Sequence, residues 1–295
     1  MDLLLPKPGS YVIAVSGGVD SVVLLDLLRQ DPALRLTVAH FDHGIRDDSE
    51  DDRRFVQNLT ATYRLPFVYK EGRLGGDASE AEAREARYAF LRQAVKASQA
   101  RAIITAHHQD DLLETAILNM LRGTGRKGLT SLKNRSDIVR PLLKVPKNEI
   151  LDYARTRGLD WRDDPSNQDT KYLRNHVRHQ IMPRFSAADR EKLVDLLAGL
   201  ETTNQELDDM LAAALGTQKP DKIERLWFNQ LPHSVAKEMM ATWLRENGVR
   251  GFDKPMLERL VTAAKTAPAG KRFPILKGVR LEVEGSHLAL AGIER

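Results

Sequence analysis

The chain has no cysteine among its 295 residues. This absence excludes disulfide bonds, thiolate metal sites, iron–sulfur clusters and cysteine nucleophiles. The sequence also lacks any uncharged apolar run near the roughly 20 residues that cross a bilayer, and its first residues lack the basic and apolar regions of a signal peptide. We therefore expect a soluble cytoplasmic protein without a membrane partner.

The net charge is small, but positive charge is concentrated in one segment. Lys and Arg total 45 and Asp and Glu total 41, so the formal charge is +4. The segment from Arg122 to Lys147 holds eight bases and the single acid Asp137, which gives it +7 and leaves −3 for the rest of the chain. Such a local excess is typical of a surface that binds a polyanion.

The first half of the chain alternates between short apolar runs and segments with apolar residues at helical spacing. Strands are predicted at residues 11–15, 36–41, 67–69, 102–105 and 138–139. Helices are predicted at residues 20–29, 49–63, 80–97, 109–121 and 147–157. This alternation indicates an α/β fold in which helices cover both faces of a parallel sheet.

The second half has a different pattern. Residues 160–183 are predicted as a polar loop with a short basic segment, and a stripe of leucines predicts one long helix at 188–215, which ends near Gly216. Beyond it we expect helices near 234–247 and 254–265 and strands near 272–275, 278–283 and 287–291. The expected domains are 1–184, a linker helix at 185–216 and a small α+β domain at 217–295.

A glycine-containing motif, Ser16-Gly17-Gly18-Val19-Asp20-Ser21, joins the first predicted strand to the first predicted helix. Two adjacent glycines let backbone N–H groups approach an anion, and the helix N-terminus adds a partial positive charge. The lysine of a Walker A loop is missing. The motif therefore predicts a phosphate-binding loop of another type, with a plain strand–turn–helix corner as the alternative.

Acidic and histidine side chains follow two of the predicted strands. Asp42 follows the second and His107, Asp110 and Asp111 follow the fourth, at the sheet edge where open α/β folds bind ligands. Asp42 either binds an amine or accepts a proton, or it only forms a turn. Asp111 and Glu114 share one helical face. No histidine pair has the i, i+4 spacing of a zinc helix, so nucleotide placement, Mg²⁺ binding or proton transfer is favoured over zinc, with an acidic helix start as the alternative.

Basic residues form two clusters. Arg122, Arg126 and Lys127 lie among glycines at the end of a predicted helix, and Arg174 and Arg178 are four residues apart further along the chain. Both clusters suit contacts with phosphates. Their alternatives are a favourable helix C-terminus for the first and a solvated helix face for the second.

The sequence resembles a known family at several motifs. SGGVDS resembles the PP-loop of ATP pyrophosphatases, which split ATP into AMP and pyrophosphate to adenylate a carbonyl oxygen. Further segments resemble tRNA(Ile)-lysidine synthases, in that family's order and over roughly residues 11–184: HFDHGIR (40–46), AREARY (83–88), TAHHQDD (105–111), RGTG (122–125), RPL (140–142), WRDDPSN (161–167) and RNHVRH (174–179). The tail resembles the short form of the family, with one small C-terminal domain.

The resemblance implies a Rossmann-like PP-loop domain at 1–184 that uses ATP and Mg²⁺. The C2 oxygen of the wobble cytidine in tRNA(Ile) with a CAU anticodon would attack the α-phosphate of ATP and release pyrophosphate. Free L-lysine would then attack C2 through its ε-amino group and release AMP, giving lysidine. We expect residues 217–295 to contact a distant part of the tRNA.

Particular residues are expected to carry these steps. ATP is assigned to Ser16, Gly17, Gly18, Val19, Asp20, Ser21 and His107. Catalysis is assigned to Asp42, Asp111, Arg122 and Arg174, with Asp42 or Asp111 as the base that deprotonates lysine. The tRNA is assigned to Arg126, Lys127 and Arg178, and Mg²⁺ to Asp20 and Asp111.

Three other functions are compatible with a PP-loop. A tRNA 2-thiolase resembles chemistry run through cysteines or an iron–sulfur cluster, which this sequence cannot supply. A small-molecule amide synthetase would usually need an ammonia source, and no glutaminase domain is recognisable. A tRNA-binding adaptor with a relic loop is disfavoured because the loop retains all its polar residues.

Overall fold

The computed structural model describes residues 1–42, 49–72, 80–162, 173–276 and 278–293. Two compact units divide the chain, Met1–Leu200 and Glu201–Arg295. Residues 43–46 and 163–167, which contribute to two of the motifs above, lie outside the described residues.

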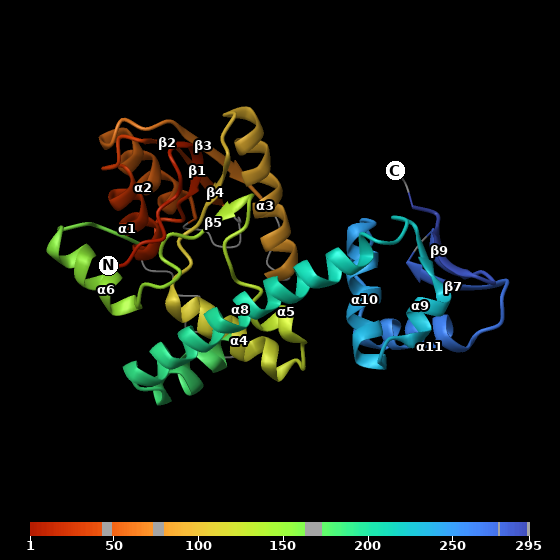
Figure 1. The fold of residues 1–295 in the computed structure, drawn as a ribbon. Coiled ribbons are helices and arrows are strands. Elements are labelled where there is room, and N and C mark those ends of the chain that lie inside the picture. Colours follow the sequence, from red (N-terminus) through yellow and green to blue (C-terminus); the bar gives the residue numbers. More distant parts are fainter. Residues whose placement is uncertain (43–48, 73–79, 163–172, 277, 294–295) are drawn as a thin grey trace. The chain divides into compact units, whose positions relative to one another are not determined.

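A parallel β-sheet forms the centre of the first unit (Figure 1). Its strands are β1 (Gly9–Ala14), β2 (Leu34–Asp42), β3 (Phe67–Glu71), β4 (Ala102–Ile104) and β5 (Ile138–Val139). They are ordered β3-β2-β1-β4-β5, and every neighbouring pair is parallel. The predicted parallel α/β domain is confirmed.

Helices cover both faces of this sheet because successive side chains of a strand point to opposite faces. Ile13 and its neighbours on one face pack against α1 (Val19–Leu28), α2 (Ser49–Thr62) and α6 (Lys147–Thr156). Val12 and its neighbours on the other face pack against α3 (Glu80–Ala97). Both Val12 and Ile13 are fully buried. Burial of each such side chain contributes about 1.5–3 kcal/mol to the free energy of folding.

A buried carboxylate ties three helices together. Asp26 of α1 is fully buried and accepts hydrogen bonds from Arg29 at 2.6 and 2.9 Å, from Tyr63 at 3.2 Å and from Tyr153 of α6 at 2.9 Å. Burial alone would raise the pKa of Asp26, but these donors outweigh it and the pKa is lowered. The carboxylate is therefore ionised and fixes the packing of α1 against α6 and the end of α2.

The rest of the first unit is helical. It contains α4 (Gln109–Leu121), α5 (Arg126–Leu129), α7 (Leu173–His176), a π-helical turn (Val177–Ile181), a 3₁₀ turn (Met182–Arg184) and the first part of α8 (Ala187–Leu215). The expected polar loop and basic segment at 160–183 thus contain helical turns in their described part. Val177 and Met182 are buried against Leu113 of α4. A π turn has no 3.6-residue repeat, so the pattern did not reveal it.

The second unit combines helices with an antiparallel sheet, as expected for a small α+β region. Its elements are β6 (Lys222–Glu224), α9 (Arg225–Gln230), α10 (His233–Glu246), α11 (Lys254–Thr266), β7 (Lys271–Leu276), β8 (Val279–Val283) and β9 (His287–Ala291). The strand order is β6-β9-β8-β7. Trp243 and Phe228 are buried at its core.

The long helix α8 serves both units. Leu193 and Leu197 belong to the core under α4, whereas Leu211 and Leu215 belong to the core of the second unit. The division of the chain falls at Leu200, within this helix. The expected roles of 1–184, 185–216 and 217–295 as separate domains stay a prediction.

Candidate functional site

The order of the parallel strands creates a switch point between β1 and β4. The chain passes from β1 to β2 and β3 on one side and then crosses to β4 and β5 on the other. Loops that follow neighbouring strands diverge at such a point and open a crevice at the carboxyl edge of the sheet. The loop Ser16–Ser21 follows β1 and the segment from Thr105 to His108 follows β4, so the fold brings two predicted motifs to one place.

Hydrogen bonds among its own side chains and backbone shape the Ser16–Ser21 loop. The Ser21 hydroxyl donates to the Gly18 carbonyl at 2.8 Å and accepts from the Ser16 N–H at 3.2 Å. Gly17 has φ +99°, a conformation that strains any residue with a Cβ. Among the described residues no side chain caps the start of α1, so its first N–H groups are available to an anion.

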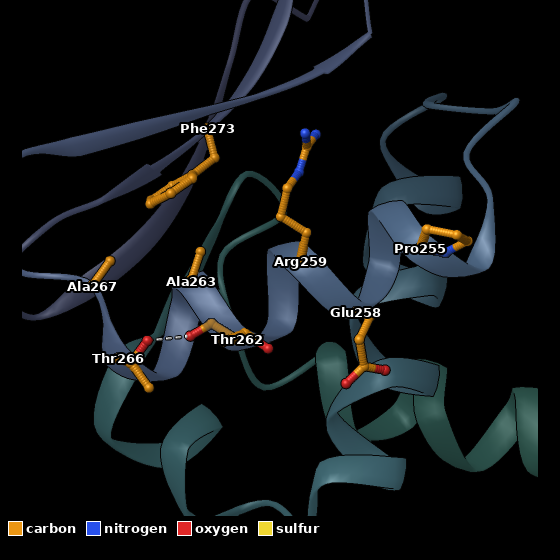
Figure 2. A pocket seen from close by; sticks show the side chains of 8 residues that line it. All are labelled: Pro255, Glu258, Arg259, Thr262, Ala263, Thr266, Ala267 and Phe273. Atoms are coloured by element: carbon orange, nitrogen blue, oxygen red, sulfur yellow. Dashed lines mark hydrogen bonds between the residues drawn. The ribbon is translucent and has the colours of Figure 1, made fainter.

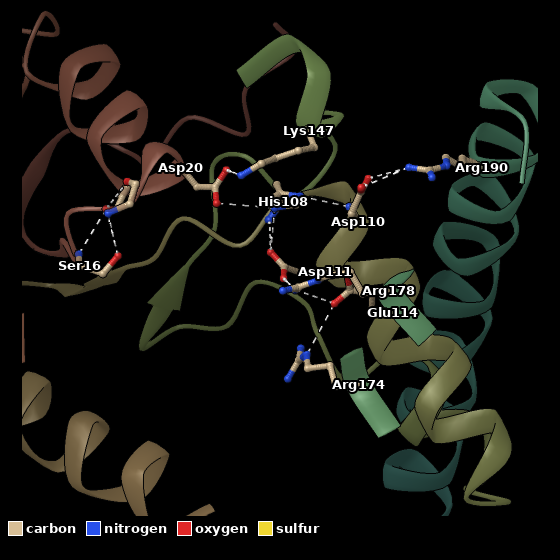
Figure 3. Close-up of polar contacts among 12 residues, drawn as sticks. Ser16, Asp20, His108, Asp110, Asp111, Glu114, Lys147, Arg174, Arg178 and Arg190 are labelled. Carbon is tan, nitrogen blue, oxygen red and sulfur yellow. Dashed lines mark hydrogen bonds and ion pairs between the residues drawn. The ribbon is translucent and has the colours of Figure 1, made fainter. Parts of the chain in front are cut away.

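A chain of polar contacts leads from this loop to α4 (Figure 3). Lys147, the first residue of α6, lies 2.5 Å from one oxygen of Asp20, and Nε2 of His108 lies 3.8 Å from the other. The same imidazole nitrogen is 3.5 Å from Asp111. Asp20 and Asp111 therefore flank one histidine, although they belong to different helices.

The first turn of α4 explains why Asp111 is held so firmly. His108 is the N-cap residue: its Nδ1 accepts the N–H of Asp110 at 3.2 Å, while Asp111 accepts the N–H of His108 at 3.0 Å. Asp110 faces the other way and pairs with Arg190 of α8 at 3.2 Å. Asp110 therefore fits the alternative of an acidic helix start, while Asp111 contacts His108 and Arg178.

Two arginines contact the carboxylates of Asp111 and Glu114, which together are called the acidic cluster (Figure 3). Arg178 makes a two-pronged contact with the buried Glu114 at 2.7 and 2.8 Å and lies 3.6 Å from Asp111. Arg174 lies 3.6 Å from Glu114 and donates to Thr115 at 3.4 Å. Both predicted arginines therefore reach the site through carboxylates of α4.

The electrostatics of the site separate its ionised from its neutral groups. Burial would raise the pKa of Asp111, but His108, His107, the N–H of His108 and Arg178 outweigh it and the pKa is lowered. Burial lowers the pKa of His107 to about 3, and nearby arginines act in the same direction against Asp111. Its Nδ1 lies 2.8 Å from the Thr105 hydroxyl. At neutral pH the site combines an ionised Asp111 with an uncharged His107.

The remaining predicted site residues lie further away. Asp42 is buried at the end of β2, two strands from β4 in the sheet order. Arg122 is the C-cap of α4, eleven residues and about 16 Å along the helix from Asp111. Arg126 and Lys127 form the start of α5, just beyond it. The three basic residues therefore lie at and beyond the end of α4 that is remote from Asp111.

Sequence reasoning did not assign a role to Lys147 or Arg190. Lys147 lies 127 positions from its partner Asp20, and Arg190 lies 80 positions from its partner Asp110. Sequence pattern alone gives no information on contacts at such separations. One signal existed for Lys147: a cation at the first position of a helix opposes the helix dipole, so its presence there calls for a partner such as Asp20.

Within the ranges that the structure describes, no three His, Asp or Glu side chains are grouped so that they could hold a metal ion. In the same part of the chain, no helix is both long enough and apolar enough to cross a bilayer.

A separate hollow lies on the second unit (Figure 2). Phe273 of β7 faces Ala263 and Ala267 of α11 across it, and Glu258 and Arg259 lie along the same helix. None of the predicted site residues lines this hollow. The polar contacts of the first unit are therefore the candidate functional site.

Residues 4–185 match the family model of the PP-loop domain. The chain belongs to the PP-loop family. The match covers the whole parallel sheet, the Ser16–Ser21 loop and both arginines of the acidic cluster. From here on the Ser16–Ser21 loop is called the PP-loop.

Curated relatives of this PP-loop protein carry one shared name. This chain is 32% identical over 297 residues to a tRNA(Ile)-lysidine synthase of Methylococcus capsulatus, and the match covers 91% of this chain and 65% of that protein. It is 43% identical over 274 residues to the synthase of Nitrosomonas europaea, covering 86% and 59%. It is 41% identical over 188 residues to that of a Thermotoga species, covering 60% and 45%.

The chain spans about half to two thirds of the length of these relatives.

Among solved structures, a U34-tRNA thiolase from Methanococcus maripaludis aligns with a TM-score of 0.47 at 20% identity, covering 68% of this chain and 69% of that one.

Proposed function

We propose that the protein joins free L-lysine to C2 of the wobble cytidine of an isoleucine tRNA with a CAU anticodon, forming lysidine at the expense of ATP. The observation that carries the proposal is the meeting of the PP-loop with the Asp20–His108–Asp111 contacts at the switch point. It is supported by relatives named tRNA(Ile)-lysidine synthase that are 32% and 43% identical over most of the chain.

In the first step the C2 oxygen of the cytidine attacks the α-phosphate of ATP, pyrophosphate leaves and the RNA is adenylated. The PP-loop suits the departing phosphates because its glycine backbone and the uncapped start of α1 present N–H donors to an anion. Lys147 beside Asp20 adds a positive charge at the same place.

Asp20 and Asp111 are the proposed Mg²⁺ ligands. Mg²⁺ is commonly held by one or two carboxylates together with substrate phosphates rather than by a full protein cage, and two carboxylates on either side of His108 fit that mode. When bound, the ion offsets the charge of the phosphates.

In the second step the ε-amino group of lysine attacks C2, and AMP leaves with the former C2 oxygen. The ammonium group has an ordinary pKa of about 10.4 and must lose a proton before it attacks. Asp111, kept ionised by its neighbours, and the buried Asp42 are the two proposed bases. Arg174 is proposed to stabilise negative charge on the adenylate, and His107 to contact the nucleotide in its neutral form.

The basic residues beyond α4 are proposed to bind the tRNA backbone. Arg122, Arg126 and Lys127 lie at the end of α4 and the start of α5, in the segment whose net charge is +7. Arg178 is proposed as a further contact, with its carboxylate partners fixing its orientation.

The decisive experiment incubates the protein with radiolabelled lysine, ATP and a transcript of an isoleucine tRNA with a CAU anticodon. We expect label in the RNA and release of AMP and pyrophosphate. A methionine tRNA transcript with the same anticodon is the matched control and should stay unlabelled.

ATP–pyrophosphate exchange with and without tRNA separates the other functions. Exchange that needs tRNA but gives no lysine transfer would indicate a different tRNA modification. Exchange that ignores tRNA would indicate a small-molecule synthetase, and no exchange at all would indicate a binding protein.

A further inference from the structure

The end of α4 exposes two large apolar side chains to solvent. Met120 is 63% exposed and Leu121 is 59% exposed, and together they are called the apolar tip. Single exposed apolar residues are normal on a protein surface, but two adjacent ones on a helix are not explained in this way. Among the described residues the other adjacent pair, Val68 and Tyr69, lies in β3, where neighbouring side chains point to opposite faces.

Helical periodicity relates the apolar tip to the site at the other end of α4. Met120 follows Leu113 by seven residues, about two helical turns, so it continues the stripe that packs in the core under α4. Leu121 follows Glu114 by the same number of residues, and Glu114 is the buried partner of Arg178. The helical face that carries Glu114 therefore continues to Leu121, about 10 Å further along the helix.

Hydrogen bonds hold the turn that joins α4 to α5. The side-chain amide of Asn119 donates to the carbonyl of Gly128 at 2.7 Å and to the hydroxyl of Ser131 at 3.0 Å. The hydroxyl of Thr124 donates to the carbonyl of Asn119 at 3.0 Å. These bonds fix α5 against the end of α4, so a ligand that contacts the apolar tip has little protein structure to order.

Positive charge flanks the apolar tip. Arg122 directly follows it and is exposed, and Arg126 and Lys127 begin α5. All three belong to the segment whose net charge is +7. A nucleotide of single-stranded RNA joins a flat base, which has an apolar face, to a negatively charged phosphate. An apolar surface between cations is therefore complementary to unpaired RNA.

We propose that the apolar tip contacts an unpaired base of the RNA substrate, while the cations beside it bind the neighbouring phosphates. Leu121 lies ten residues and about 15 Å along α4 from Asp111, a distance that a few nucleotides of one strand can span. The contacted base is thus a near neighbour of the nucleotide that reacts. This inference rests on the proposed function for the identity of the RNA, and it adds a contact that only unpaired RNA can make.

The test compares two RNAs with the full chain. Dissociation constants are measured at several salt concentrations for an anticodon stem-loop and for a fully paired duplex of the same length. The variant Met120→Gln combined with Leu121→Gln removes the apolar surface, retains good helix formers and leaves every cation in place. We expect it to bind the stem-loop about tenfold more weakly. Binding of the duplex and the salt slope should not change, because no charge is lost.

Two single variants serve as controls. Leu121→Met keeps an apolar side chain and should bind the stem-loop as the wild type does. Leu5→Ala removes a leucine that is equally exposed, at 60%, but lies ahead of β1, and it should also bind normally. Replacing the loop bases one at a time by fluorescent 2-aminopurine then locates the contact. At the contacted position, the emission should change on binding to the wild type and not on binding to the double variant.

The outcomes that overturn the proposal are distinct from those that overturn the proposed function. Unchanged stem-loop affinity in the double variant, or an equal loss for the duplex, excludes a contact with an unpaired base. A dimer of the wild type that the double variant converts into monomers, seen by sedimentation, would show that a second copy covers the apolar tip instead. A wild type that binds the stem-loop but transfers no lysine rejects lysine ligation alone, whereas one that binds neither RNA rejects both.

Discussion

At the scale of single residues, the site depends on a few groups whose positions are fixed by neighbours. Asp20 is held between Lys147 and His108, and Ser21 closes the PP-loop on itself. His107 is uncharged because it is surrounded by protein atoms and arginines. These residues can be altered one at a time with a small effect on the core, so their functional roles can be measured directly.

Asp20→Ala and Ser21→Ala are expected to reduce ATP–pyrophosphate exchange by at least about a hundredfold, because both groups are proposed to act where charge develops on the leaving phosphates. Asp20→Ala loses the contacts with Lys147 and His108, and Ser21→Ala loses three hydrogen bonds within the loop. Because these losses are local, circular dichroism should show an unchanged fold. Near-normal exchange in either variant would contradict the phosphate-binding role of the PP-loop.

His107 is expected to stay neutral over the whole range in which such an enzyme is assayed. A pKa of about 3 means that the imidazole gains its proton only in strong acid. NMR titration, with the resonance assigned from a His107→Gln variant, should therefore show a flat chemical shift between pH 5 and 8. A midpoint inside that range would contradict the neutral form proposed here for nucleotide contact.

At the scale of helices and strands, most of the architecture could be predicted. The bounds of α3 and α4 agree with the sequence pattern to the residue, because long helices with apolar residues at regular spacing have a clear periodicity. The short elements β6 and α9 were not predicted, since three to six residues hold too little of a repeat to be recognised.

Residue pattern alone located the candidate site best where its residues follow a strand, whereas Arg174 and Arg178 were assigned from the spacing of a basic segment and a family resemblance. The PP-loop and the segment at His107 and Asp111 were found because the end of a parallel strand is where ligands bind. The pairing of Asp20 with Lys147 was not, because it depends on how α6 folds back to α1.

The buried Asp26 gives the packing of α1, α2 and α6 a defined dependence on pH. Its pKa is lowered in the folded protein, so its contribution is complete above the unfolded value of about 3.9 and is lost as the pH falls below it. The free energy of unfolding of the wild type, measured by urea titration, should therefore fall steeply below about pH 4. In Asp26→Asn the same plot of stability against pH should be flatter in this range. Parallel profiles for the two proteins would contradict the role of this carboxylate.

The basic residues at the start of α5 should act on RNA binding through charge alone. Arg126→Ala combined with Lys127→Ala is expected to weaken binding of the tRNA transcript and to lower the salt slope by roughly 0.7–0.9 for each lost phosphate contact. Filter binding over a range of salt concentrations measures both. An unchanged slope would return these residues to the role of favourable charges near a helix end.

At the scale of the whole molecule, the two units share α8 but have separate cores. Leu211 and Leu215 pack within the second unit, so a chain cut at Gly216 would retain them without the core that covers them. A cut after Leu200, where the compact units divide, leaves the leucines that pack under α4 and removes the others.

A chain ending at Leu200 is expected to fold, to bind ATP as the full chain does and to lose most lysine transfer to tRNA. The reason is that phosphate contacts by the catalytic unit carry no sequence identity, so a second contact is needed to select one tRNA. Circular dichroism, ATP binding and the lysine-transfer assay measure the three properties. Full transfer by the short chain would exclude a recognition role for the second unit.

The π-helical turn at Val177–Ile181 gives one stretch of the chain a tolerance of length change in one direction only. A π turn closes its hydrogen bond one residue later than an α turn, so it holds one residue more between nearly the same two side-chain directions. Removing a single residue such as Gln180 would therefore let the stretch close as an ordinary α turn and leave Met182 in the core beneath α4, where only 3% of it is exposed. Inserting a residue there would instead rotate Met182 by about 100° away from that core.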